Sequence, residues 1–320
     1  MNLLKRRLPC LAVALLTLLA LAACAPARNI PDSRLKVTVT TTMLLDLTQQ
    51  IGGDCVNVQG LMGSGVDPHQ YRASAGDVIK MQHADVVIYS GLHLEGKMGD
   101  VLSSLESCGK AVICAADGID SSQLIQNDGV YDPHIWFDVT LWQLAAKEVA
   151  GGLSAADPAN AEAYEKNLAA YNGQLEELEQ YIRERAGELD ETQRVLITAH
   201  DAFGYFGRAY GFTVMGLQGV STAAEAGTSD VSRLAAFIAE NEIHAVFVET
   251  SLPVKSIEAL QEAVRSKGFE TTLGGTLYSD SLGDETNGED NYTAAFRHNI
   301  DVIVDGLKGD TDYQKQITDN

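Results

Sequence analysis

The sequence predicts an α/β protein of two lobes, each with a mostly parallel sheet flanked by helices, joined by one long rigid helix. Three observations lead to this prediction. Short β-rich segments alternate with helical segments in the first half, the same alternation returns in the second half, and a long amphipathic segment lies between them. Strands that alternate with helices favour parallel sheets covered on both faces. The length of 320 residues suits two domains.

Residues 1–23 have the pattern of an export signal. Lys5, Arg6 and Arg7 precede an apolar run over 8–23, which is shorter than the roughly 20 residues of a membrane span. A basic start, a short apolar core and small residues before a cleavage point are typical of a signal peptide. No other apolar run is long enough to span a bilayer, so we expect the remaining chain to fold outside the membrane.

A short stretch after this signal predicts an anchor. The letters LAAC at 21–24 resemble a bacterial lipobox, which implies cleavage before Cys24 and attachment of lipid to its thiol. The alternative is an ordinary secretion signal with an incidental cysteine. Residues 24–34 lack apolar periodicity and contain two prolines, which predicts a flexible lipidated tether. The expected location is outside the cytoplasm, lipid-anchored on the outer face of the cytoplasmic membrane or in the periplasm.

The charge and the cysteines exclude some functions. The formal charge is −21, and it would be near −24 without the three basic residues of the signal. Such an acidic protein is a poor partner for nucleic acid. Cys55, Cys108 and Cys114 remain in the mature chain without a Cys-x-x-Cys pair, which disfavours a thiolate zinc site. A bridge between Cys108 and Cys114 and buried free thiols are both open alternatives.

The first lobe is predicted over 35–156 and the second over 191–310, followed by a tail at 311–320. The expected strands of the first lobe are 36–42, 56–61, 84–90 and 111–115, and its helices are 43–53, 74–82 and 97–107. The expected strands of the second lobe are 194–200, 213–217, 245–250 and 271–278, and its helices are 203–210, 231–241, 254–268 and 291–307.

The linking helix is predicted over 157–190. An apolar residue recurs every three or four positions, which marks one buried helix face: Tyr164, Leu168, Tyr171, Leu175, Leu178 and Ile182. Asp157 is expected to cap the helix, with Pro158 at its first position. About 29 residues would span roughly 44 Å, long enough to cross both lobes and limit hinging. A dimerising coiled coil is the alternative, although we expect a monomer.

Four side chains are expected to meet at the carboxyl ends of strands, where open α/β sheets bind ligands. His69 and Asp280 follow predicted strands, His200 ends one, and His134 lies in a second copy of the triplet Asp-Pro-His that also contains His69. In each triplet, Asp is expected to cap a helix and Pro to fix its first turn, so that His projects from rigid backbone. Helices that merely start at Asp-Pro are the alternative. The other four histidines are predicted not to be ligands: His83, His93, His244 and His298.

A set of ordered motifs supports a family resemblance. GVDPHQY, ADVVIYSGLHLEGKM, YDPHIWFD, TAHDAFGYFGRAYGF, LQGVSTAAEAG, VFVETS and LYSDSLG occur in this order between about 35 and 308. Together they resemble the zinc/manganese solute-binding lipoproteins of bacterial ABC transporters, the TroA-like type. The resemblance implies two α/β lobes around one long helix, modest closure, and delivery of the ion to a membrane permease. It also implies four metal ligands, namely His69, His134, His200 and Asp280.

The expected cargo is Zn²⁺ or Mn²⁺. Three imidazoles and one carboxylate suit zinc, which also has the higher intrinsic affinity. Family members dedicated to manganese or iron look to have Glu at the third position, where this chain has His200. Members dedicated to zinc often have a His-rich loop, and residues 116–132 contain no His. We expect tight zinc binding in vitro, with manganese open as the cargo in the cell.

Imidazole ligands usually donate their second N–H to a carboxylate or carbonyl. Asp138, Asp201 and Glu249 are the candidates for this role because they lie close in sequence to the ligand motifs or strand ends.

Two other functions compete with metal binding and delivery. A zinc hydrolase would use three histidines on zinc and Glu249 as base. Asp280 would instead close the fourth position, and neither His-Glu-x-x-His nor Gly-x-Ser-x-Gly occurs. A metal-dependent surface adhesin is the third hypothesis, because surface lipoproteins of this family are sometimes described so, but no residue supports it separately from metal uptake.

Overall fold

A computed structural model describes residues 33–127 and 129–309. The predicted signal peptide, Cys24, most of the tether and the tail at 311–320 lie outside the described residues. From Leu35 onward the chain clusters as one compact unit. Among the described residues, no helix is both long and apolar enough to cross a membrane.

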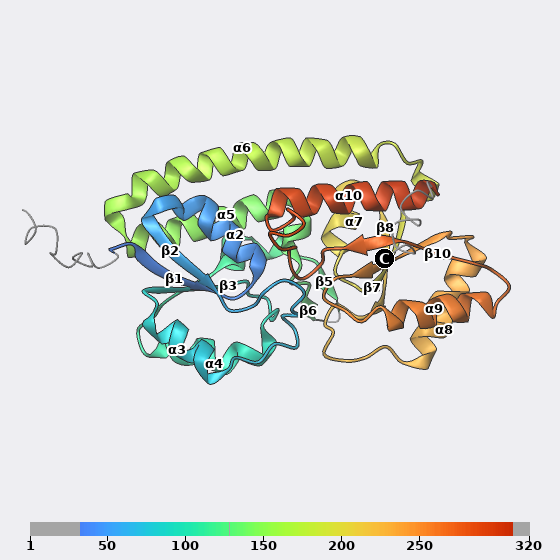
Figure 1. Cartoon of the computed structure of the whole chain (residues 1–320), viewed down its shortest axis with the longest axis horizontal. Helices are drawn as coiled ribbons and strands as arrows, with labels where there is room; N and C mark the ends of the chain where they lie inside the picture. Colours follow the sequence, from blue (N-terminus) through green and yellow to red (C-terminus); the bar gives the residue numbers. More distant parts are fainter. Residues whose placement is uncertain (1–32, 128, 310–320) are drawn as a thin grey trace, which may run out of the picture. The chain divides into compact units, whose positions relative to one another are not determined.

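The first lobe contains a four-stranded parallel sheet in the order β2-β1-β3-β4 (Figure 1). Its strands are β1 Leu35–Val39, β2 Val56–Gly60, β3 Val86–Tyr89 and β4 Ala111–Cys114. Its helices are α2 Thr42–Gly52, α3 Ala75–His83, α4 Gly99–Ser107 and α5 Val139–Ala156. Helices α2 and α5 cover one face, and α3 and α4 cover the other (Figure 1). The parallel sheet predicted for this half is confirmed.

The second lobe has a similar arrangement, but its strands form two two-stranded parallel sheets that lie side by side. Its strands are β7 Val195–His200, β8 Thr213–Gln218, β9 Ala245–Glu249 and β10 Thr272–Leu277. Strand β7 pairs in parallel with β8, β9 pairs in parallel with β10, and β7 lies against β9. The spatial order is therefore β8-β7-β9-β10, which matches the first lobe. Its helices are α7 Gly204–Tyr210, α8 Thr228–Glu240, α9 Lys255–Arg265 and α10 Tyr292–Lys308.

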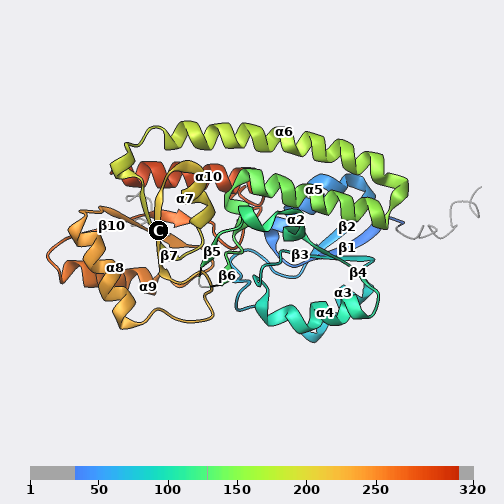
Figure 2. The ribbon, with the colours of Figure 1, turned by 180° about the vertical axis from the view of Figure 1, so that it is seen from behind.

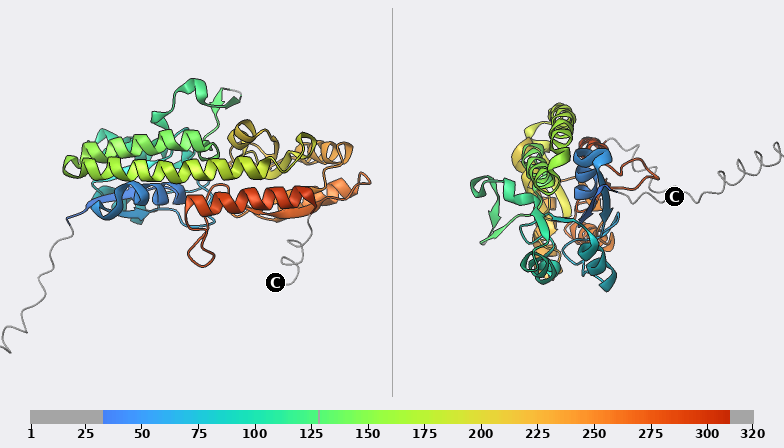
Figure 3. Two further views of the ribbon diagram at one scale, coloured as in Figure 1. Left: turned by 90° about the horizontal axis from the view of Figure 1, so that it is seen from above. Right: turned by 90° about the vertical axis from the view of Figure 1, so that its left-hand side faces the viewer.

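One long helix, α6 Ala161–Ala186, contacts helices of both lobes (Figures 1 and 3). It packs against α2 and α5 of the first lobe and against α7 and α10 of the second. Its 26 residues span about 39 Å. Five of the six residues predicted for its apolar stripe are buried, and Leu168 is partly buried. The presence of the long helix is confirmed.

The start of this helix differs from the prediction. Residues Pro158–Asn160 form a short 3₁₀ turn, and Asn160 stands at the amino-terminal cap of α6. Asp157 ends α5, and its Oδ2 accepts hydrogen bonds from Asn160 Nδ2 at 2.7 Å and from the Tyr164 hydroxyl at 2.8 Å. Asp157 thus stabilises the corner between two antiparallel helices (Figure 2).

A helix was expected to start at the second Asp-Pro-His, without a stated end, and the structure has α5 starting later, at Val139. Helix α5 has 18 residues, and Gly152 on it lies so close to Ile113 that an added Cβ would come within 2.3 Å of that side chain. The glycines within α5 weaken its helical pattern in the sequence, but the lack of a Cβ at Gly152 lets α5 approach β4 closely. A two-stranded antiparallel hairpin, β5 Gln126–Asn127 and β6 Val130–Tyr131, lies just before the second Asp-Pro-His.

The apolar core falls into three clusters. The largest runs through both lobes and α6, and includes Trp136 and Phe137 from the first lobe with Phe203 and Phe296 from the second. A second cluster is confined to the second lobe, between its sheet and α8 and α9. A third is confined to the first lobe and contains Met62, Met81 and Met98. The two lobes therefore share one continuous core on the side of α6.

Candidate metal centre

The structure brings together His69, His134, His200 and Asp280. One ligand atom from each lies within 4.8 Å of the ligand atoms of the other three, and all four residues are buried. His69 and His134 come from the first lobe, and His200 and Asp280 come from the second. The four residues expected at the carboxyl ends of strands thus form one group.

The spacing of these atoms fits a metal ion. The Nε2 atoms of His69 and His134 are 3.3 Å apart, and Asp280 oxygens lie 3.4 Å from His134 Nε2 and 3.3 Å from His200 Nε2. His69 Nε2 is 3.8 Å from Asp280 Oδ2. Zinc binds nitrogen and oxygen at about 2.0–2.2 Å, which places tetrahedral ligand atoms about 3.3–3.6 Å apart. The group is close to the size of a four-coordinate site.

The first Asp-Pro-His lies in a loop after β2. Asp67 Oδ1 accepts a hydrogen bond from the backbone N–H of His69 at 2.8 Å, as an Asx turn does. The backbone N–H of Tyr71 donates to Asp67 O at 3.1 Å, but no α-helix follows. The prediction that His69 projects from the first turn of a helix is therefore wrong, because a single turn is sufficient to position it.

The second Asp-Pro-His has the same turn with a different use of its carboxylate. Asp132 Oδ1 accepts from the backbone N–H of His134 at 2.9 Å and also lies 2.7 Å from its Nδ1. A short 3₁₀ turn, Ile135–Phe137, follows, so here too no α-helix begins at the histidine. Burial alone would lower the pKa of His134, but the charges of Asp132 and Asp280 outweigh it and raise the pKa to about 9.

His200 is the last residue of β7 and is oriented by the last residue of β9. Glu249 Oε1 accepts from the backbone N–H of His200 at 2.9 Å, and Oε2 lies 2.6 Å from its Nδ1. Burial opposes the charged imidazole, but Glu249 and Asp280 together raise the pKa of His200 well above its ordinary value. Nδ1 is held by Glu249, so Nε2 points to Asp280.

Asp280 follows β10, and side chains of two other segments hold the backbone just before it by hydrogen bonds. Asn299 on α10 accepts from the N–H of Tyr278 at 2.9 Å and donates to its carbonyl at 2.7 Å. Trp136 Nε1 donates to the carbonyl of Ser279 at 3.0 Å. Among the described residues, the oxygens of Asp280 have no conventional hydrogen-bond partner and face the imidazoles. Burial raises the pKa of Asp280, but the neighbouring imidazoles outweigh it and hold the pKa well below its ordinary value.

The three carboxylates predicted to orient imidazoles have different positions. Glu249 contacts His200, as described above. Asp138 instead caps α5, where Oδ1 accepts from the N–H and hydroxyl of Thr140 at 2.9 and 2.6 Å. Asp201, the residue after His200, is partly buried; burial raises its pKa, and it lines a surface hollow with Gly216 and Gln218.

The carboxylate that contacts His134 is Asp132, which we did not predict from the sequence. Asp138 lies close to the motif in the sequence, but it is the amino-terminal cap of α5, so its carboxylate accepts a hydrogen bond from the backbone of that helix. The signal for Asp132 was present in the triplet itself, because Asp two residues before His can bond the backbone and the ring together.

The remaining histidines lie outside the group. His83 is the exposed last residue of α3, His93 has a positive φ of 66° in a loop, and the ring of His244 packs 5.3 Å from that of Phe269. His298 on α10 is partly buried, with its Nδ1 2.7 Å from Glu289 and its Nε2 3.0 Å from the carbonyl of Thr276. The three free thiols, Cys55, Cys108 and Cys114, form no disulfide.

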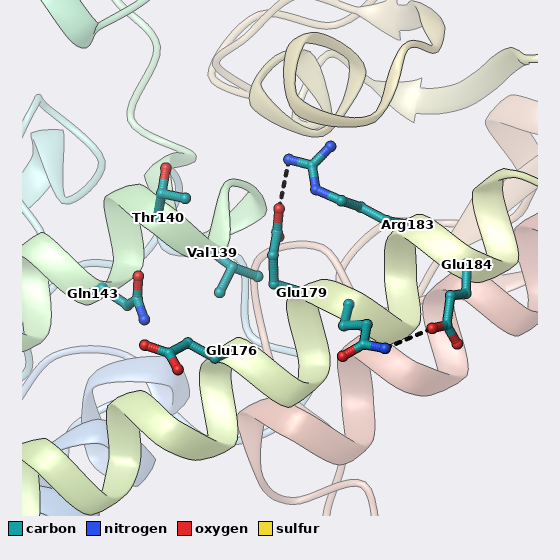
Figure 4. Close-up of a pocket in the computed structure, with 8 residues that line it drawn as sticks. Val139, Thr140, Gln143, Glu176, Glu179, Arg183 and Glu184 are labelled. Carbon is teal, nitrogen blue, oxygen red and sulfur yellow. Dashed lines mark hydrogen bonds and ion pairs between the residues drawn. The ribbon is translucent and has the colours of Figure 1, made fainter.

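A surface hollow lies away from the four grouped residues. It has a volume of about 530 Å³ and is lined by residues of α5 and α6, including Thr140, Gln143 and Glu176 (Figure 4). Glu179 and Arg183, one turn apart on α6, form an ion pair at 2.6 Å at its edge. None of the four grouped residues lines it. The candidate metal centre is therefore a closed cluster of facing side chains, separate from this open hollow.

Two similar α/β lobes, a long helix against both, and a closed group of three imidazoles and one carboxylate between them define a class of protein. This class is the solute-binding proteins of ABC transporters whose solute is a metal ion. The chain belongs to the family of the periplasmic component A of zinc-uptake complexes, whose model matches residues 37–306.

Individual relatives agree with this assignment. The chain is 45% identical over 277 residues to the zinc-binding protein TroA of Treponema pallidum, covering 86% of this chain and 90% of the relative. It is 46% identical over 279 residues to the manganese-binding lipoprotein MntA of Bacillus subtilis, covering 87% and 91%.

Solved structures show the same fold. The periplasmic zinc-binding protein TroA of Treponema pallidum superposes with a TM-score of 0.84 at 45% identity, covering 86% of this chain and 99% of that one. A Mn-bound periplasmic metal-binding protein from Candidatus Liberibacter asiaticus gives a TM-score of 0.76 at 26% identity, covering 86% and 100%.

Proposed function

We propose that this protein captures one divalent metal ion, Zn²⁺ or Mn²⁺, between its lobes and delivers it to the permease of an ABC transporter. The ligands are Nε2 of His69, His134 and His200 and the carboxylate of Asp280. The observation that carries the proposal is the set of ligand-atom spacings of 3.3–3.8 Å in a buried group drawn from both lobes. A buried cluster of this kind is unfavourable unless a cation or protons compensate its carboxylate.

The metal is assigned by ligand chemistry. Three imidazoles and one carboxylate bind zinc more strongly than manganese, and Asp132 and Glu249 hold two of the imidazoles through Nδ1. The two relatives at similar identity are named for different metals, zinc in one and manganese in the other. Zinc therefore binds more tightly in solution, and supply in the environment decides which ion is carried.

The protein is proposed to act as a monomer outside the cytoplasm, attached to the membrane by lipid on Cys24 through the tether 24–34. The LAAC stretch supports the lipid, and relatives named as lipoproteins are consistent with it. The closed metal group lies within a single chain and needs no residue from a second copy.

A hydrolase is disfavoured by two contacts. Asp280 occupies the position that an open zinc site leaves for water. Glu249, the residue considered as base, has Oε1 on the His200 backbone and Oε2 on the His200 ring. Both oxygens of Glu249 thus face His200, which suits a carboxylate that orients the imidazole better than one that takes a proton from water.

Isothermal titration and elemental analysis test the proposal. The full protein should bind one Zn²⁺ or one Mn²⁺, and the double variant His69→Ala/Asp280→Ala should lose most of this binding. The matched control is His83→Ala/Asp284→Ala, which removes one exposed residue of each type and should bind as the wild type does. Full-strength binding by the first double variant would contradict the assigned site.

A further inference from the structure

The carboxylate of Asp280 is held differently from the imidazoles of His134 and His200. A carboxylate holds Nδ1 of His134, and another holds Nδ1 of His200. Among the described residues, both oxygens of Asp280 face imidazoles and have no other hydrogen-bond partner. The direction in which this carboxylate points is therefore set by the backbone on which it is carried.

The backbone just before Asp280 is held from both lobes. Asn299, in the second lobe, bonds the N–H and the carbonyl of Tyr278. Trp136, in the first lobe, donates from Nε1 to the carbonyl of Ser279 at 3.0 Å. This carbonyl belongs to the peptide group that ends at the nitrogen of Asp280, so the indole bond is the nearer of the two to the ligand side chain.

Trp136 also contacts His134, the ligand two residues before it. The two rings meet edge to face, with centroids 5.3 Å apart and planes at 75°. The carbonyl of Trp136 accepts from the Tyr292 hydroxyl of the second lobe at 2.6 Å, and the side chain is fully buried. One indole therefore lies against a ligand of the first lobe and bonds the backbone of a ligand of the second.

We propose that Trp136 is a positioning residue of the metal centre, that it fixes the carboxylate of Asp280 relative to the imidazole of His134, and that it thereby favours Zn²⁺ over Mn²⁺. This inference rests on the proposed function, and it adds a determinant of metal selectivity to it. Trp136 offers no ligand atom, so it acts only through the two ligands that it holds.

The selectivity follows from the geometry that each ion prefers. Zinc takes four ligands at short distances in a tetrahedron, and the spacings of 3.3 and 3.4 Å between Asp280 oxygens and two imidazoles suit it. Manganese binds imidazole less strongly and prefers oxygen ligands in an octahedron. A carboxylate fixed at tetrahedral spacing therefore benefits zinc more than manganese.

Removal of the indole N–H should weaken this preference. The buried carbonyl of Ser279 would lose its donor, and the peptide before Asp280 would be free to shift. Loss of a group that orients a ligand typically lowers metal affinity at least tenfold, so we expect about a tenfold loss for zinc. Manganese should lose no more than about threefold, because the relaxed carboxylate suits its geometry better.

The experiment measures the affinities of the full protein for Zn²⁺ and Mn²⁺ by competition with a chelator of known affinity. Trp136→Phe keeps an aromatic ring and removes the N–H. Trp142→Phe is the matched control, because this second buried indole donates to the Tyr171 hydroxyl at 3.1 Å and bonds no ligand backbone. The ratio of zinc to manganese affinity should fall about threefold or more in Trp136→Phe and stay at the wild-type value in Trp142→Phe. An unchanged ratio in Trp136→Phe, or an equal fall in both variants, would overturn the proposal.

A measurement on the wild type keeps the proposal testable if Trp136→Phe does not fold. The chain has two tryptophans, so its nitrogen-15 spectrum has two indole N–H signals, and Trp142→Phe assigns them. Addition of Zn²⁺ should shift the Trp136 signal and slow its hydrogen exchange, while the Trp142 signal should stay in place. A Trp136 signal that is unchanged when zinc binds would overturn this inference alone. If the wild type bound neither ion, the proposed function would fail and this inference with it.

Discussion

The two Asp-Pro-His triplets have identical letters and the same local turn, yet their carboxylates do different work. Asp132 uses Oδ1 on both the backbone and the ring of His134. Asp67 uses Oδ1 on the backbone of His69 and Oδ2 on Thr222 of the other lobe. The triplet therefore determines a turn, and neighbours from elsewhere in the chain determine whether its aspartate orients an imidazole or joins the two lobes.

The two imidazoles also differ in their pKa values. Burial lowers the pKa of His69 to about 3, although Asp280 opposes the effect. Asp132 and Asp280 overcome burial at His134 and raise its pKa to about 9. Glu249 and Asp280 likewise raise the pKa of His200. We therefore expect binding of the ion to release protons from His134 and His200, whereas His69, whose pKa is lowered, has none to release.

The largest expected effect comes from removal of each histidine in turn. His134→Ala removes a ligand and leaves Asp132 buried without its partner, so affinity for Zn²⁺ should fall by more than about a thousandfold. His69→Ala leaves the other three ligands in place, with the carboxylates that hold His134 and His200, and should cost about ten- to a hundredfold. Competition with a chelator of known affinity measures both. A greater loss from His69→Ala would reverse the assigned difference between the triplets.

The next effect comes from the two aspartates. Asp132→Asn should lower affinity about ten- to a hundredfold, as is usual when a carboxylate behind a ligand imidazole is lost. Asp67→Asn should change equilibrium affinity less and should mainly speed release of the ion. Titration gives the affinities and chelator mixing gives the rates. Identical profiles for the two variants would show that both triplets act in the same way.

The pH dependence follows from the raised pKa values of His134 and His200. Below these pKa values the ion must displace protons, so affinity should rise with pH from neutral pH upward, by about tenfold per pH unit for each proton released. Titration calorimetry in buffers of different ionisation enthalpy counts these protons, and at least one should leave per ion at pH 7. In Asp132→Asn the pKa of His134 should fall, so fewer protons should leave per ion at pH 7. Proton release unchanged by that substitution would contradict the role of Asp132.

The smallest expected effect concerns Asp138, the carboxylate that the sequence wrongly predicted to orient an imidazole. Asp138→Ala removes the cap of α5 and should lower the free energy of unfolding by about 1 kcal/mol. Its affinity for Zn²⁺ should stay at the wild-type value, because Asp138 bonds Thr140 and faces Arg208. Denaturant unfolding and metal titration measure the two quantities. A hundredfold loss of affinity would place Asp138 with Asp132.

Much of the fold and the candidate site followed from local sequence. Alternating segments predicted the parallel sheets, and the apolar stripe from Tyr164 to Ile182 predicted the long helix. Strand ends predicted that His200 and Asp280 would meet the two triplets. These features depend on periodicity and on the direction of parallel strands, both of which are set by residues close together in the chain.

The contacts that only the tertiary structure decided join residues far apart in the chain. The sequence determined that Asp67 and Asp132 would each turn back to the N–H of its histidine, because that bond spans two residues. It did not determine that Asp67 meets Thr222 of the other lobe, or that Asn299 on α10 holds the backbone before Asp280. The first contact forms only once the two lobes pack together and the second only once α10 packs on its sheet, since packing alone brings these distant groups within hydrogen-bond reach.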